Sequence, residues 1–107
     1  MGITMLKQKT FRSNKWLAAV GQIECCVLCG AWGTQVAHRN ELKGMGMKTD
    51  DCATAAICQE CHHEIDNGSH LSREERRCLM NRAIVLTVIK LARCGLITPA
   101  TLRGKRR

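Results

Sequence analysis

Two pairs of cysteines with the spacing C-x-x-C restrict this chain more than any other feature of its sequence. Cys26 and Cys29 form the first pair, and Cys58 and Cys61 form the second. A gap of two residues lets a tight turn aim two thiolates at one metal ion, and two such turns complete a tetrahedral zinc site. Four sulfur ligands leave no open position, so the expected zinc is structural. We therefore predict a fold held together by one structural Zn²⁺.

The other cysteines leave one alternative open for this zinc site. Cys25 directly precedes Cys26 and competes for its ligand position, although the two-residue spacing favours Cys26. Cys52, Cys78 and Cys94 have no partner at ligand spacing, so we expect them to be small core residues. The chain opens without an apolar leader, which predicts a cytoplasmic protein with reduced thiols. Reduced thiols favour metal binding over disulfides.

Length and charge indicate one small domain with a polyanionic partner. The 107 residues include one Phe and no Tyr, so the core is poor in large side chains. We expect a single domain over 1–107, with flexible basic segments at 1–12 and 99–107. The net charge of +8 favours DNA as the partner over a role in solubility alone. No apolar run is long enough to span a membrane, so we expect no membrane partner.

Capping signals predict an N-terminal helix and a second short helix. Ser13 is the expected N-cap of a helix over Asn14–Val20, which Gly21 ends. The residues after Cys58 predict another short helix that ends near Asn67-Gly68. These helices belong to a small α+β fold.

A strand and a long C-terminal helix complete the expected elements. Thr34–His38 is typical of a short strand. Ser72 and Glu75 have capping-box spacing at the start of a long helix, which Gly95 stops. Its wide apolar face serves as core or as the seam of a homodimer. The face comprises Leu79, Met80, Ala83, Ile84, Leu86, Val88, Ile89 and Leu91.

Two histidines fall where a shared zinc would bring them together. His38 ends the predicted strand between the cysteine pairs, and His62 directly follows the last cysteine. Asp66 lies four residues after His62, so the two side chains share one helical face. Cutting a phosphodiester requires a base for the water, such as imidazole, and a cation for the charge on the phosphate. Oxygen donors favour Mg²⁺, whereas histidine ligands shift the preference toward ions such as Mn²⁺.

The segment from Cys26 to Asp66 resembles the HNH endonucleases, which have a ββα-metal core, and it is most similar to small phage and prophage nucleases of the YbcO kind. The resemblance is carried by Val36-Ala37-His38-Arg39-Asn40, Lys43-Gly44-Met45-Gly46-Met47-Lys48-Thr49-Asp50-Asp51 and Cys58-Gln59-Glu60-Cys61-His62-His63-Glu64-Ile65-Asp66. It implies a zinc-stabilised HNH core between the N-terminal helix and the long C-terminal helix.

The resemblance also implies roles for individual residues. His38 takes the position of the general base, and His62 that of the helix ligand to a catalytic Mg²⁺ or Mn²⁺. Asp51 stands in for the central Asn of the family, as a ligand or as a brace for the loop. Ala37 occupies a position where the family often has Asp or His, so Asp51 or Asp66 has to supply the missing oxygen ligand.

The function implied is a metal-dependent DNA endonuclease that hydrolyses phosphodiester bonds. Its expected context is recombination, repair or processing of phage or prophage DNA in a bacterial host cell. Arg39, Lys43 and Lys48 in the basic loop are expected to bind the DNA backbone. A non-catalytic zinc-dependent nucleic-acid-binding module explains the charge and the cysteines equally well. An adaptor that binds a partner through the apolar helix face is a third interpretation.

Overall fold

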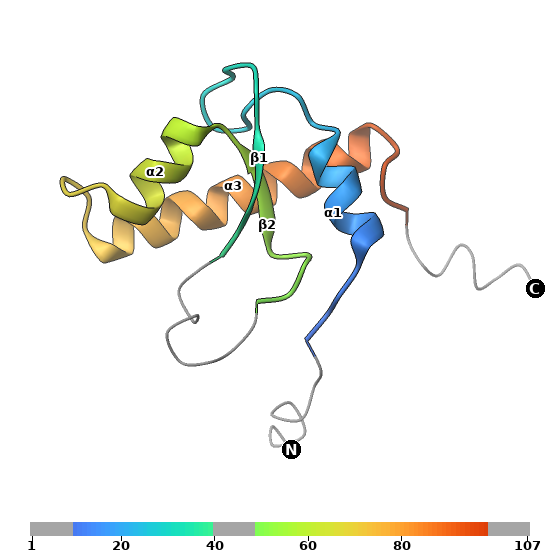
Figure 1. The fold of residues 1–107 in the computed structure, drawn as a ribbon, viewed down its shortest axis with the longest axis horizontal. Helices are drawn as coiled ribbons and strands as arrows, with labels where there is room; N and C mark the ends of the chain where they lie inside the picture. Colours follow the sequence, from blue (N-terminus) through green and yellow to red (C-terminus); the bar gives the residue numbers. More distant parts are fainter. Residues whose placement is uncertain (1–9, 40–48, 99–107) are drawn as a thin grey trace, which may run out of the picture.

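Two strands and three helices make up the described part of the chain, residues 10–39 and 49–98 of the computed structural model (Figure 1). The elements follow the order α1 (Asn14–Gly21), β1 (Gln35–His38), β2 (Thr54–Ile57), α2 (Gln59–Asn67) and α3 (Arg73–Arg93). This arrangement confirms the small α+β class. Residues 1–9 and 99–107, which we expected to be flexible, lie outside the described residues.

The sheet is a two-stranded antiparallel hairpin, and its second strand lies in the core. The register places His38, at the end of β1, opposite Thr54. All four residues of β2 are buried. Because side chains alternate along a strand, Ala55 and Ala56 belong to different core clusters, here called the first and the second cluster. Their small side chains let neighbouring elements pack closely on both faces of the strand.

The long helix α3 packs along β2 and connects the two clusters (Figure 1). Met80 and Ala83 belong to the first cluster, and Leu91 belongs to the second. Between them, the buried hydroxyl of Thr87 accepts the backbone N–H of Ala56 at 3.1 Å. The same hydroxyl donates to the carbonyl of Ala83 at 2.7 Å. This side chain therefore fixes the helix against a backbone group of β2 that the hairpin leaves unpaired.

The predicted helix boundaries are confirmed within one residue of each capping signal. The Ser13 hydroxyl accepts the backbone N–H of Trp16 at 3.1 Å at the start of α1. Ser72 and Glu75 form both halves of a capping box at the start of α3. Gly95 has φ +71° directly after the C-cap of that helix, a conformation that favours glycine. The strand begins at Gln35 rather than at the predicted Thr34.

Residues 11 and 12 are held against the domain, in contrast to the flexible basic arm expected for residues 1–12. The backbone N–H of Phe11 donates to Oδ1 of Asp50 at 2.8 Å. The backbone N–H of Asp51 donates to the carbonyl of Phe11 at 2.9 Å. Arg12 forms an ion pair with Asp51 at 3.1 Å. The chain before α1 thus runs along the residues that precede β2.

The prediction that the unpaired cysteines are core residues is wrong for two of the three. Cys78 and Cys94 are exposed, and Cys52 is half-buried. Cys78 lies on the solvent side of α3, and Cys94 is the C-cap of that helix.

Part of the predicted apolar face of α3 also remains exposed. Ile89 of that face is 44% exposed, and Val85, which was not assigned to the face, is 57% exposed. The homodimer expected through this helix stays a prediction. Within residues 10–39 and 49–98, no helix is both long enough and apolar enough to cross a membrane.

Candidate functional site

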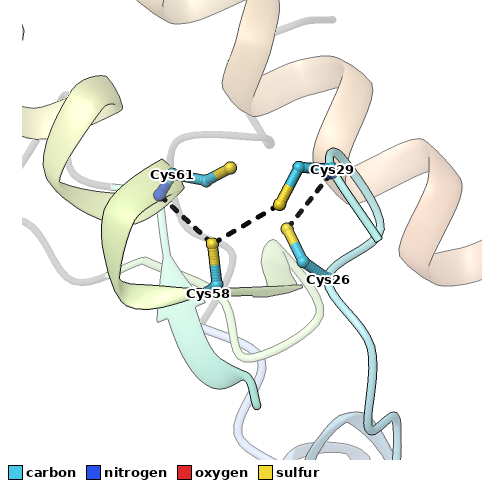
Figure 2. A group of neighbouring side chains, drawn as sticks. All are labelled: Cys26, Cys29, Cys58 and Cys61. Carbon is cyan, nitrogen blue, oxygen red and sulfur yellow. Dashed lines mark hydrogen bonds between the residues drawn. The ribbon is translucent and has the colours of Figure 1, made fainter. Parts of the chain in front are cut away.

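The four predicted zinc ligands come together in one cluster (Figure 2). The ligand atoms of Cys26, Cys29, Cys58 and Cys61 all lie within 4.8 Å of one another. The sulfurs of Cys29 and Cys58 are 3.7 Å apart. Tetrahedral zinc with Zn–S bonds of about 2.3 Å holds its sulfurs about 3.8 Å apart. The cluster can therefore hold one metal ion, and its geometry is compatible with structural zinc.

Each cysteine pair is shaped by local backbone geometry that favours metal binding. The first sulfur of each pair accepts backbone N–H groups from the turn that follows it. Cys26 accepts from Leu28 at 3.4 Å and from Cys29 at 3.5 Å. Cys58 is the N-cap of α2 and accepts the N–H of Cys61 at 3.4 Å. Such N–H donors orient a thiolate and stabilise its charge.

The protonation of these thiols matches the same geometry. Burial raises the pKa of Cys26, but N–H groups from Cys29, Cys58 and Leu28 outweigh it and lower the pKa to about 6. Burial and the neighbouring sulfurs raise the pKa of Cys61. A metal ion bound by these cysteines would displace the protons that the thiols carry.

The structure distinguishes Cys26 from its neighbour Cys25. Cys25 is exposed and pairs with Trp32 in an isolated antiparallel bridge, outside the sulfur cluster. Gly30, with φ +83°, turns the chain back directly after Cys29. The predicted choice of Cys26 as the ligand therefore agrees with the geometry.

The cysteine cluster joins the loop before β1 to the start of α2, and a cavity of about 190 Å³ lies nearby. Three elements contribute its functional side chains. His38 comes from the end of β1, His62 and Asp66 come from α2, and a group of arginines comes mainly from α3. The lining comprises His38, Arg39, His62, Ile65, Asp66, Arg73, Arg76, Arg77 and Met80.

Within this cavity His62 and Asp66 form a pair of donors suited to a cation. Nε2 of His62 lies 3.2 Å from Oδ2 of Asp66, one helical turn along α2. Nδ1 of the same ring lies 2.8 Å from Oε1 of Gln35 on β1, which holds the ring in place. Neighbouring ligands of an ion with bonds of about 2.1 Å are about 3 Å apart. The predicted pair therefore has the spacing of two ligands on one ion.

The other predicted ligand, Asp51, contacts His38 instead of His62. Oδ1 of Asp51 lies 3.2 Å from Nε2 of His38. The carboxylate is almost completely buried and also accepts the backbone N–H of Ser13 at 2.8 Å and Nη1 of Arg12 at 3.1 Å. The N–H of Ser13 lowers the pKa of Asp51, with further contributions from His38 and Arg12. A carboxylate that accepts Nε2–H leaves the lone pair of His38 on Nδ1.

The arginines that line the cavity were not anticipated from the sequence, except for Arg39. Arg73, Arg76 and Arg77 lie in the first two turns of α3. Arg76 also donates to the carbonyl of Asp66 at 3.1 Å. Nη2 of Arg39 donates a hydrogen bond to Oδ1 of Asn81. Nε of Arg39 is buried and has no hydrogen-bond partner among the described residues. The spacing of Arg73, Arg76 and Arg77, at i, i+3 and i+4 on one helix, was the signal available in the sequence.

In the described part of the chain, His62 and Asp66 have no third protein ligand close enough to share an ion with them. Among the described residues, the four cysteines are the one group of three or more His, Cys, Asp or Glu close enough to share an ion. A catalytic ion at His62 and Asp66 would therefore take its other ligands from water or a phosphate. Lys43 and Lys48, predicted to bind DNA, lie outside the described residues.

Comparisons with known proteins gave no significant match to this chain. No family model matches the chain, and neither the curated proteins nor the solved structures give a significant match.

Proposed function

We propose that this protein is a divalent-cation-dependent DNA endonuclease of the HNH kind, stabilised by one zinc ion on its four cysteines. The observation that carries the proposal is the cavity into which His38, His62 and Asp66 open together beside several arginines. Phosphodiester hydrolysis requires a general base, ligands for a cation and positive charge near the phosphate, and the residues that line this cavity offer all three.

In this proposal each side chain has a distinct role. Nδ1 of His38 takes a proton from a water molecule, whose oxygen attacks the phosphorus. The bond to the leaving oxygen breaks, and that oxygen takes a proton from solvent. Asp51 holds the His38 ring through Nε2 and stabilises the imidazolium that forms. His62 and Asp66 would hold a divalent cation, which would supply charge stabilisation for the phosphate oxygens. The arginines of α3 hold the phosphate in the cavity.

The test is a nicking assay on supercoiled plasmid with Mg²⁺ or Mn²⁺ and the zinc-loaded protein. We expect His38→Ala to lower the rate by roughly 10²- to 10⁴-fold, the usual contribution of a general base. The matched control is His70→Ala, because His70 is exposed, pairs with Glu64 at 3.1 Å and does not line the cavity. Zinc content and thermal unfolding of each variant show whether the fold is retained.

The outcomes separate the two candidate functions. Cleavage by the wild type that depends on the cation and on His38, but not on His70, supports the nuclease. Binding of DNA without cleavage under every cation would contradict it and would favour the non-catalytic binding module.

A further inference from the structure

The most exposed large apolar side chain of the described residues lies outside the cavity. Trp32 is 79% exposed, in the loop between α1 and β1. The other tryptophan, Trp16, is half-buried and packs edge-to-face against Phe11 at 6.3 Å. An indole ring left in water is a flat apolar surface that is available for stacking.

The loop that carries Trp32 is held firmly by its own backbone. Three hydrogen bonds of 2.8 Å close it: Cys26 N–H to the Ala31 carbonyl, Gly30 N–H to the Cys26 carbonyl, and Gly33 N–H to the Glu24 carbonyl. The cysteine cluster fixes the same loop against the start of α2 (Figure 2). A rigid support lowers the entropic cost of binding at an exposed aromatic ring.

A groove of about 440 Å³ lies beside this ring, and its chemistry differs from that of the cavity. Its lining includes Trp32, Thr34 and Gln35 from the segment that leads into β1, and Gln59 and Glu60 from the start of α2. Among the described residues that line the groove, none is Lys or Arg, whereas four arginines line the cavity. A zinc ion on four thiolates, with Cys58 in the groove wall, would add negative charge. The groove therefore disfavours a phosphate and suits an uncharged, planar group with polar edges.

The groove and the cavity are connected through one residue. Gln35 lines the groove, and its side chain contacts His62 in the cavity at 2.8 Å. Gln35 lies three positions after Trp32, which is at most about 10 Å of extended chain. A strand whose phosphate occupies the cavity would thus bring a nearby base to the groove.

We propose that the groove beside Trp32 binds an unpaired nucleobase of the strand whose phosphate enters the cavity. The inference rests on the proposed function and names its substrate class: single-stranded DNA, or DNA with an unpaired segment next to the cleaved bond. A base within a duplex is stacked between its neighbours and cannot present its face to Trp32. Stacking on the indole is sequence-tolerant, because every base has such a face.

The test measures binding rather than cleavage, by fluorescence anisotropy on zinc-loaded protein that also carries His38→Ala. Three labelled probes of equal length are compared: an oligothymidylate, the same backbone with abasic sites, and a duplex. We expect the oligothymidylate to bind more tightly than the abasic strand by roughly 5- to 150-fold, the usual effect of stacking one base. Trp32→Ala should abolish this difference, and Trp32→Phe should retain most of it.

The matched control is Val85→Ala, which removes an exposed apolar side chain from α3, outside the lining of the groove. It should leave the preference for bases unchanged. Equal binding of thymidine and abasic strands by the wild type, or tighter binding of the duplex, would overturn the inference. So would an unchanged base preference in Trp32→Ala, which would leave the ring as a contact for another protein.

The nicking assay keeps this result separate from the proposed function. A protein that binds bases through Trp32 but never cuts DNA would refute the nuclease and retain the groove. A protein that cuts DNA but ignores the bases would do the reverse.

Discussion

Nε2 of His38 lies 3.2 Å from Oδ1 of Asp51, a carboxylate that the fold encloses almost completely. The same carboxylate accepts the backbone N–H of Ser13, the N-cap of α1. The orientation of the proposed base is therefore coupled to the chain that precedes the first helix. This connection reaches outside the segment from Cys26 to Asp66, because Ser13 lies before its first residue.

The first prediction concerns this pair. Asp51→Asn keeps the shape of the side chain but replaces one acceptor oxygen by a donor, so His38 loses a partner that fixes its tautomer. We expect the nicking rate to fall by about 10- to 100-fold, as is typical when the orienting partner of a histidine is lost. Zinc content should be unchanged. A rate equal to that of the wild type would show that Asp51 does not position the base.

The pH dependence of stability gives a second prediction for the same residue. The folded pKa of Asp51 is lowered below its ordinary value of 3.8. The stability contributed by this carboxylate is then fully present above that value and is lost as the pH falls below it. A histidine changes its charge between about pH 5 and pH 8, so the measurement uses protein that also carries His38→Ala. In that background the decrease in melting temperature caused by Asp51→Asn should be constant from about pH 5 to pH 8. A decrease that vanishes near the acid end of this range would contradict the assigned contacts.

The neighbouring cysteines give a third, closely matched prediction. Cys26→Ser removes a ligand from the cluster, whereas Cys25→Ser changes an exposed thiol next to it. We expect Cys26→Ser to lose bound zinc and to unfold at a much lower temperature, because the metal contributes directly to folding. Cys25→Ser should retain one zinc per chain. Elemental analysis and circular dichroism measure both effects, and the opposite result would assign the ligand to Cys25.

The arginines of α3 allow a fourth prediction, in which every variant loses the same single positive charge. Arg73→Ala and Arg76→Ala remove cations that line the cavity, whereas Arg82→Ala removes one outside its lining. Each cavity variant should weaken DNA binding. It should also reduce the magnitude of the negative slope of log affinity against log salt concentration by about 1. Arg82→Ala should leave the slope unchanged. Equal effects of all three would mean that the charge acts only through the overall field of the protein.

A fifth prediction tests the packing of α3 on β2. Thr87→Val keeps the shape of the side chain but removes the hydroxyl that accepts the N–H of Ala56. An unsatisfied buried N–H costs about 1–3 kcal/mol, so the free energy of unfolding should fall by that amount. Thr87→Ser retains the hydroxyl and should lose less. Chemical denaturation measures both, and an unchanged Thr87→Val would exclude this hydrogen bond as a source of stability.

The elements that the sequence predicts well are those set by local chemistry. Ser13 and Ser72 cap helices because their hydroxyls accept nearby N–H groups, and this depends on only a few neighbouring residues. The spacing within each cysteine pair is similarly local. The meeting of the two pairs follows because four thiolates at ligand spacing rarely occur without a shared metal.

Features that depend on how distant elements pack were not predictable from the sequence alone. The sequence left open whether Asp51 is a ligand or a brace, because that depends on the position of residues 12 and 13. The spacing of Arg73, Arg76 and Arg77 indicates that they share one face of α3. That this face lies beside α2 depends on tertiary packing, which no local pattern indicates. Cys78 is apolar enough for a core, yet the orientation of α3 leaves it in solvent.

The hydrogen bonds at the open end of the hairpin bear on protein engineering. Its open end is closed by hydrogen bonds from the Arg39 N–H to the Ala53 carbonyl at 3.1 Å and from the Thr49 hydroxyl to the Arg39 carbonyl at 2.7 Å. Both attachment points of residues 40–48 are thus anchored to the frame that carries His38. Lengthening such a connection costs little, about 0.6 kcal/mol for each doubling. Foreign sequences grafted between these anchors should leave the register of the hairpin, and with it the position of His38, unchanged.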